Sequence, residues 1–135
     1  MKKVLKITLA IFSFCFLCVA IIIIGYFTNV IFPWERTKSI QEAIDMGGLS
    51  ELPIEAENIE IEKRGSMFTR QYVIEFDCTE AEIEKWIDKS KRLKNNIPKI
   101  EGKTKIYEIY PGEKGAMGGK VKIEKSKVSV NMSWS

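Results

Sequence analysis

The glycine-rich segment at residues 111–119, Pro-Gly-Glu-Lys-Gly-Ala-Met-Gly-Gly, has the composition of a loop that could hold a phosphate group. A phosphate-binding loop has the spacing Gly-x-x-x-x-Gly-Lys, continues with Ser or Thr, and opens a helix. Gly119-Lys120 supplies the second half, but Lys114 stands where the first glycine is needed and Val121 replaces the hydroxyl residue. The sequence predicts strands on both sides. We therefore expect a hairpin tip here, with a partner-binding loop as the alternative.

Four carboxylates, Asp77, Glu80, Glu82 and Glu84, lie close together in the sequence. Two carboxylates held side by side can act as general acid and general base. These residues also surround the predicted start of a helix, where negative charge stabilises the helix dipole. Thr79 and Glu82 have the spacing of a capping box. We therefore favour a structural role for the cluster and keep an acid–base pair as the alternative.

The chain contains no histidine, which excludes His-dependent triads and His-containing zinc sites. Ser66, Ser90 and Cys78 have no local base, and we expect Cys78 to be a buried core thiol. Cys15 and Cys18 have Cys-x-x-Cys spacing but fall within an apolar run without the water access that a thiolate needs, so we expect packing residues there. The sequence predicts no catalytic residue, no metal ligand and no cofactor site. Lysine-dependent serine chemistry stays open.

An apolar run at residues 7–32 positions everything that follows, and it lies between the charges of Lys6 and Glu35. Residues 7–27 would form a helix about 31 Å long, close to the thickness of the hydrocarbon core of a bilayer. Lys2 and Lys3 also precede the run, and basic residues favour the cytoplasmic side. We therefore expect a single-pass helix in the cell (inner) membrane, with residues 1–6 as a cytoplasmic stub and the rest of the chain outside.

An uncleaved signal anchor is favoured over two alternatives. A cleavable signal peptide has a shorter apolar core and a small-x-small cleavage site, and residues 25–29 offer no such site. A lipoprotein needs a small residue before the acceptor cysteine, but Phe14 precedes Cys15 and Leu17 precedes Cys18. The sequence therefore predicts that the helix remains attached to the domain.

About 100 residues follow the apolar run, enough for one compact domain. Tyr26 and Trp34 are placed where interfacial aromatic side chains occur, which marks the end of the span. Residues 33–57 are expected to form a juxtamembrane helix, at 35–46, and a polar linker. The apolar stripe of this helix is narrow, so two placements are left open, against the domain or against lipid headgroups. Residues 58–135 form the extracytoplasmic domain.

Hydrophobic periodicity in residues 58–135 predicts five strands and one helix. Val128, Val130, Met132 and Trp134 alternate with polar residues, which is typical of a sheet with one buried and one solvated face. Trp86 is the expected apolar anchor of the helix. The elements are expected at 58–62, 67–76, 80–91, 104–110, 120–124 and 127–134, with a basic loop at 94–103. The predicted class is α+β, a small antiparallel sheet with one packed helix in the order β-β-α-β-β-β.

Charge is distributed unevenly along the chain. Three of the 21 basic residues precede the apolar run, which leaves 18 basic and 18 acidic residues in the rest of the chain. A neutral domain argues against nucleic-acid binding. Residues 35–62 hold eight acidic and two basic residues, whereas residues 85–105 hold eight basic and two acidic ones. The segments either neutralise each other or one of them contacts a charged partner, such as an acidic protein or anionic lipid.

The candidate partner surface combines this basic segment with the glycine-rich segment. Its predicted residues are Lys89, Lys91, Arg92, Lys94, Lys99, Gly115, Met117 and Gly118. Exposed ion pairs contribute little to folding. Reversal of Lys91, Arg92 and Lys94 to glutamate is therefore expected to leave the fold intact and to weaken an acidic partner or lipid contact.

Residues 52–135 resemble a type of small membrane-anchored bacterial domain of unknown function. The features that carry the resemblance are Leu52-Pro53, Ala56, Asn58-Ile59, Phe76-Asp77-Cys78, Trp86, Gly118-Gly119 and Trp134-Ser135. The resemblance implies a domain held at a membrane and carries over no activity and no functional residues.

The sequence favours a non-enzymatic binding or accessory protein of an envelope-associated complex, in contact with the bilayer through residues 7–32 and with a protein partner. An immunity or protective protein against an envelope-acting toxin is the first alternative, and an enzyme of unrecognised type is the second. A crosslinked partner would support the favoured function, a toxin-like neighbouring gene the first alternative, and a pocket with converging polar groups the second.

Overall fold

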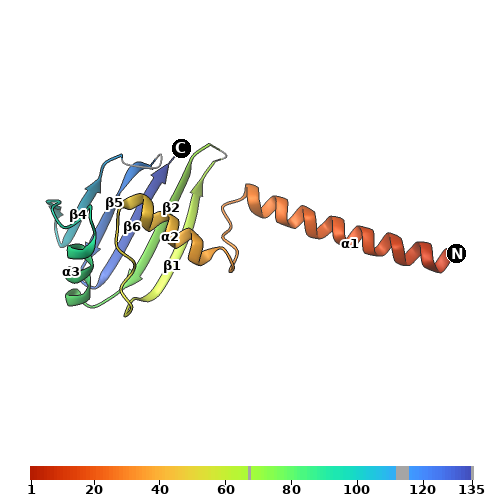
Figure 1. The fold of residues 1–135 in the computed structure, drawn as a ribbon, viewed down its shortest axis with the longest axis horizontal. Helices are drawn as coiled ribbons and strands as arrows, with labels where there is room; N and C mark the ends of the chain where they lie inside the picture. The colour runs from red at the N-terminus through yellow and green to blue at the C-terminus, as the bar shows by residue number, and fades with distance from the viewer. Residues whose placement is uncertain (67, 112–115, 135) are drawn as a thin grey trace. The chain divides into compact units, whose positions relative to one another are not determined.

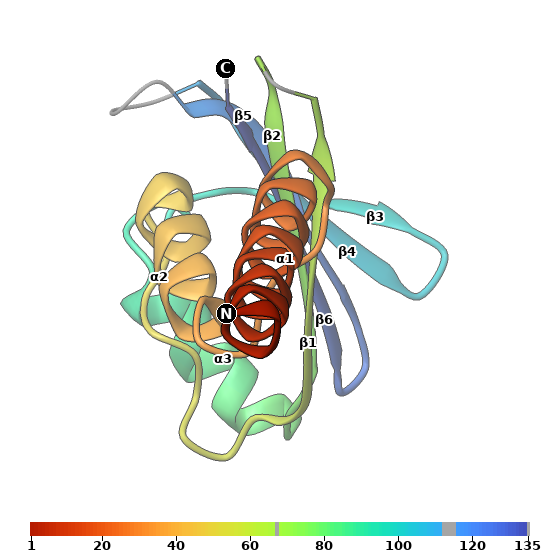
Figure 2. The same cartoon turned by 90° about the vertical axis from the view of Figure 1, so that its right-hand side faces the viewer.

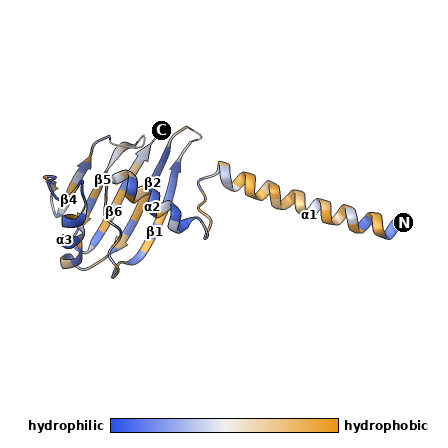
Figure 3. Cartoon of the chain, in the orientation of Figure 1, coloured by the Kyte–Doolittle hydropathy of each residue, from blue (hydrophilic) through white to orange (hydrophobic). Residues whose placement is uncertain are grey.

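The apolar run forms one uninterrupted helix, α1, from Lys2 to Phe27 in the computed structural model of the chain (Figure 1). The structure describes residues 1–66, 68–111 and 116–134. Residues 1–30 form one compact unit and residues 31–135 a second one. Hydrophobic residues cover most of α1 (Figure 3), and the helix is long and apolar enough to cross a membrane. Its length and composition are compatible with a single-pass anchor or a signal sequence.

The second unit is a six-stranded antiparallel sheet with two helices, as far as the structure describes it (Figure 1). In chain order its elements are α2 (Arg36–Gly47), β1 (Glu57–Gly65), β2 (Arg70–Asp77), α3 (Glu80–Lys89), β3 (Lys99–Glu101), β4 (Thr104–Ile109), β5 (Ala116–Glu124) and β6 (Lys127–Trp134). The strands follow the spatial order β1-β2-β6-β5-β4-β3. The predicted α+β class is confirmed.

The strand β3 is the main difference from the predicted order of elements. It lies inside the segment expected to be a basic loop, and it pairs with β4 through Lys99 and Ile106. Gly102, in a left-handed conformation, closes the tight turn that follows. A strand of three residues is too short to show an alternating pattern, which is why periodicity missed it. The observed order is β-β-α-β-β-β-β.

The helix α2 packs on the sheet, so of the two placements considered for it, against the domain or against lipid headgroups, the structure shows the first. The described part of the domain therefore has two packed helices, whereas the sequence predicted one. Three small residues one turn apart, Ser39, Ala43 and Gly47, are buried together with Ile44. Because these side chains are small, the helix backbone approaches the sheet closely: a Cβ on Gly47 would lie 3.4 Å from the sulfur of Met132. A narrow apolar stripe is therefore sufficient to bury this helix.

The helix α3 begins and packs as its sequence predicts. The backbone N–H of Glu82 donates to the hydroxyl of Thr79, at 3.3 Å, which satisfies one of the orphan donors of the first turn. The carboxylate of Glu82 does not complete the reciprocal half of a capping box, because it pairs with Lys85. Ile83 and Trp86 face the sheet and are buried.

The core lies between these helices and one face of the sheet. Ile74 and Phe76 on β2, and Val130 on β6, are almost completely buried. The ring of Trp86 meets Phe76 edge to face, with centroids 5.7 Å apart. The indole N–H of Trp86 donates to the carbonyl oxygen of Ser50 at 3.0 Å, so the polar atom of this buried side chain is satisfied.

Trp86→Ala should lower the free energy of unfolding of the domain by about 3–5 kcal/mol, because it removes a large buried aromatic side chain. This is a large part of the total stability of a small domain, about 5–15 kcal/mol. Denaturant unfolding of the full chain in detergent, followed by circular dichroism of the sheet, measures the change. Lys85→Ala, on the exposed side of the same helix, is the matched control. An unchanged midpoint for Trp86→Ala would contradict the assigned core.

Candidate functional site

The sheet exposes one face, because both helices of the second unit cover the other (Figure 2). Successive side chains of a strand alternate between the faces, so the buried residues of β6 are Val128, Val130 and Met132, and Ser129 and Asn131 point to the open face. The open face is consequently mostly polar, with Val73 and Ile106 as apolar members. It offers hydrogen-bonding groups held by a rigid sheet.

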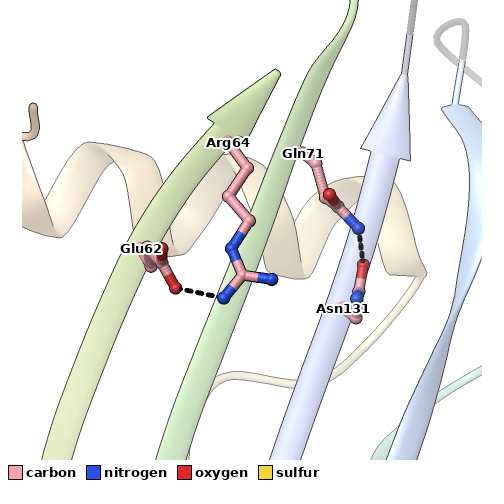
Figure 4. Close-up of polar contacts among 4 residues, drawn as sticks. All are labelled: Glu62, Arg64, Gln71 and Asn131. Atoms are coloured by element: carbon pink, nitrogen blue, oxygen red, sulfur yellow. Dashed lines mark hydrogen bonds and ion pairs between the residues drawn. The ribbon is translucent and has the colours of Figure 1, made fainter. Parts of the chain in front are cut away.

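Two polar pairs order side chains on the open face (Figure 4). The amide of Gln71 on β2 donates to the amide oxygen of Asn131 on β6, at 2.7 Å. On the edge strand β1, Arg64 contacts Glu62 at 2.7 Å, and this hydrogen bond lowers the pKa of the Glu62 carboxyl below its ordinary value. The amide pair has donors and acceptors left over for a ligand, because each amide carries more hydrogen-bonding capacity than one bond uses.

An exposed tyrosine, Tyr110, separates two shallow hollows at the end of β4. The hollow on the open face is lined by Gln71, Glu108, Ile109, Tyr110, Pro111, Met117, Gly119, Lys120, Asn131 and Ser133. The hollow at the edge of the sheet is lined by Lys91, Arg92, Asn95, Asn96, Ile97, Glu108, Ile109 and Tyr110. We define the exposed members Lys91, Asn95, Ile97, Tyr110, Met117 and Lys120 as the Tyr110 surface.

The Tyr110 surface combines exposed apolar groups with basic groups. The side chains of Ile97, Tyr110 and Met117 are 90%, 73% and 54% exposed. Aromatic residues and methionine are enriched in protein interfaces. Within the described residues, Lys91 and Lys120 form no ion pair. Their charges are therefore available to an acidic partner.

Among the described residues, Glu108 is the one carboxylate that lines both hollows, and its charge is offset. Its carboxylate accepts a hydrogen bond from the ammonium of Lys99 at 2.7 Å, and this bond lowers the pKa of Glu108 below its ordinary value. Lys120 lies opposite Glu108 on the neighbouring strand. Glu108 thus stays ionised at neutral pH, and the lysines around it keep the surface from becoming acidic.

The structure separates the predicted partner residues instead of bringing them into one surface. Lys91 and Met117 belong to the Tyr110 surface, and Lys99 is committed to Glu108. Lys89, at the end of α3, lines a different hollow beneath the 50–55 loop. Lys94 is exposed on the turn after α3. Gly115 lies outside the described residues.

Arg92 has a structural role that its sequence position did not reveal. The side chain is half-buried; its guanidinium donates to the carbonyl of Tyr110 at 2.7 Å, and its backbone N–H donates to the carbonyl of Gly48 at 3.2 Å. Its stem lies against Gly48, where an added Cβ would be 2.8 Å from Cγ of Arg92. Arg92 therefore connects the end of α2 to the end of β4. No local pattern in the sequence signals this long-range contact.

Gly118, also among the predicted partner residues, is required by the backbone. It has a φ of +103°, and an added Cβ would lie 2.5 Å from the carbonyl oxygen of Ile109. It marks the point where the register of β5 against β6 shifts by one residue. This glycine therefore shapes the strand beside the Tyr110 surface, and residues 112–115 of the same segment lie outside the described residues.

Three of the four carboxylates near the start of α3 have separate partners. Glu82 pairs with Lys85, Glu84 pairs with Lys105, and Asp77 accepts a hydrogen bond from the amide of Asn58. These contacts fit the structural role favoured for the cluster. Cys78 is buried as predicted, and burial raises the pKa of its thiol. In the described part of the chain, no three His, Cys, Asp or Glu side chains gather as a metal site would need.

Comparison with protein-family models, with curated proteins and with solved structures finds no match for this chain. The geometry of its own side chains is therefore the basis for inferring what it binds. Among the described hollows, the pair that meets at Tyr110 joins exposed apolar groups to unpaired lysines. We take the Tyr110 surface as the candidate binding site.

Arg92→Ala should lower the free energy of unfolding by about 1.5–3 kcal/mol, because it removes a charge-assisted hydrogen bond to Tyr110 and the packing of the stem on Gly48. Lys91→Ala, the preceding residue on the same turn, should leave stability unchanged. Denaturant unfolding of the two variants beside the parent chain measures the difference. Equal stability of the two variants would show that Arg92 is only a surface cation.

Proposed function

We propose that this chain is a single-pass membrane protein that displays its α+β domain outside the cell (inner) membrane and binds a partner protein there. It acts as a non-enzymatic accessory component of an envelope-associated complex. The observation that carries the proposal is the Tyr110 surface, in which Tyr110, Met117 and Ile97 stand exposed beside Lys91 and Lys120, which form no ion pair with the residues that the structure describes.

The anchor is supported by the composition of α1. Its residues from Ile7 to Phe27 carry no charge, and they are long enough to cross the hydrocarbon core at about 1.5 Å per residue. Lys2, Lys3 and Lys6 favour a cytoplasmic N-terminus. The domain then lies outside, and the cytoplasmic part is only a short stub.

Partner binding is supported by the chemistry of the Tyr110 surface. Tyr110 is a rigid amphipathic side chain, which makes it suitable as a binding anchor. Lys91 and Lys120 lie on its two sides and favour a partner with acidic groups. Arg92 and Gly118 fix the backbone beneath, so that little conformational entropy is lost on binding. The partner that fits is a protein with an apolar pocket rimmed by carboxylates.

The topology gives the first test. Protease added to intact spheroplasts should digest the domain and leave a membrane-embedded fragment that contains α1. The measurement is immunoblotting with tags at both ends of the chain. A protected C-terminal tag would contradict the orientation, and a soluble mature domain would contradict the anchor.

The binding surface gives the second test. Tyr110→Ala and the double variant Lys91→Glu with Lys120→Glu should each reduce recovery of a crosslinked partner from intact membranes. Matched controls are Phe68→Ala, an 82% exposed aromatic at another hairpin tip, and Lys103→Glu, an exposed lysine on the β3–β4 turn. The loss caused by charge reversal should shrink at high salt, because exposed charges are screened over about 10 Å at an ionic strength of about 0.1 M. Equal losses in the controls would place binding elsewhere.

A further inference from the structure

Phe32 and Trp34 form an aromatic stack in which Phe32 is half-buried and the Trp34 ring is open to solvent. Their rings are nearly parallel, at 3°, with centroids 4.7 Å apart. Trp34 is 74% exposed, whereas Trp86 is buried in the core. A tryptophan held at this exposure gains little from folding of the domain itself, since its ring contacts water on most of its surface. Its position suggests a contact outside the domain.

The stack belongs to the second unit, and a residue close to it in the chain ties its segment to β1. Ile31, just before it, packs against the core cluster. Two residues after Trp34, the guanidinium of Arg36 donates to the carbonyl of Ile59 on β1. Since β1 is an edge strand and β3 forms the opposite edge, Arg36 ties the segment that carries the stack to one edge of the sheet.

Chain length keeps the stack close to the end of α1. Trp34 follows Phe27 by seven positions in the chain, so a fully extended chain would span at most about 24 Å between them. The headgroup region beyond the hydrocarbon core is about 5–8 Å thick on each side. Tryptophan is enriched in this region because its ring is apolar and its N–H bonds to water and headgroups.

We propose that the Phe32–Trp34 stack inserts into the headgroup region and seats the domain with its β1 edge toward the bilayer. The inference rests on the proposed membrane anchor. It implies that the stack fixes the orientation of the domain relative to the bilayer. Glu57, Glu60 and Glu62 on β1 oppose anionic headgroups. The attraction therefore comes from the aromatic rings and requires no anionic lipid.

This orientation turns the Tyr110 surface away from lipid. Five strand spacings of about 4.8 Å separate β1 from β3, which places the β3 edge about 24 Å from the β1 edge. That distance exceeds the Debye length of about 10 Å at an ionic strength of about 0.1 M. Lys91, near this far edge, then faces a protein partner in the aqueous phase and lies beyond the reach of anionic headgroups.

Fluorescence quenching in phosphatidylcholine nanodiscs tests the seating with the full chain. Lipids brominated on the acyl chain near the carbonyl should remove the larger part of the Trp34 emission, taken as the difference between the parent and Trp34→Phe. A reporter at the far edge is the matched control: Ile100→Trp in the Trp34→Phe background, since Ile100 lies on β3 and is 63% exposed. Its emission should not change on bromination.

Alkaline extraction of the same variants separates this inference from the proposed anchor. If the chain stays in the membrane and Trp34 is quenched no more than the Ile100→Trp reporter, the seating is overturned and the anchor stands. If the chain is extracted, the anchor and the seating both fall. Retention in the membrane with selective quenching of Trp34 supports both.

Discussion

Burial of one sheet face beneath two helices is the constraint on which the structure of the domain depends. A sheet with both faces in water would not hold together, and α3 alone covers only part of the width. Trp86 supplies the large aromatic contact on Phe76, and α2 completes the cover by bringing Ala43 and Gly47 close to the strands. Because both helices take the same face, the other one remains open and polar, with Gln71 and Asn131 paired across it.

The candidate site depends on the same cover. Arg92 follows α3, and it reaches both the end of α2 at Gly48 and the end of β4 at Tyr110. The place where the two helices meet the sheet therefore also sets the position of Tyr110. This connection explains how a surface without any catalytic constellation in the described residues can still be well defined, and why Arg92, which lines one of its hollows, has a structural role.

Much of the fold could be predicted from the sequence, because most of its strands and helices follow from local hydrophobic periodicity and capping residues. Alternation in β6 predicted its limits and its buried face, and Thr79 with Trp86 predicted the start and the core side of α3. Features that depend on distant contacts were not predictable. The strand β3 is too short to show the two-residue alternation of a strand. The packing of α2 depends on small residues, which give a weak hydrophobic pattern. The site brings Lys91 and Tyr110 together from separate segments of the chain.

We propose that Tyr110 contacts a partner protein outside the membrane, and site-specific photocrosslinking in living cells tests this contact. A photoreactive phenylalanine analogue placed at position 110 should give a discrete adduct heavier than the chain by the mass of its partner. The same analogue at position 68, which replaces the exposed Phe68, should give none. Absence of an adduct at position 110, or an equal adduct at both positions, would contradict the account.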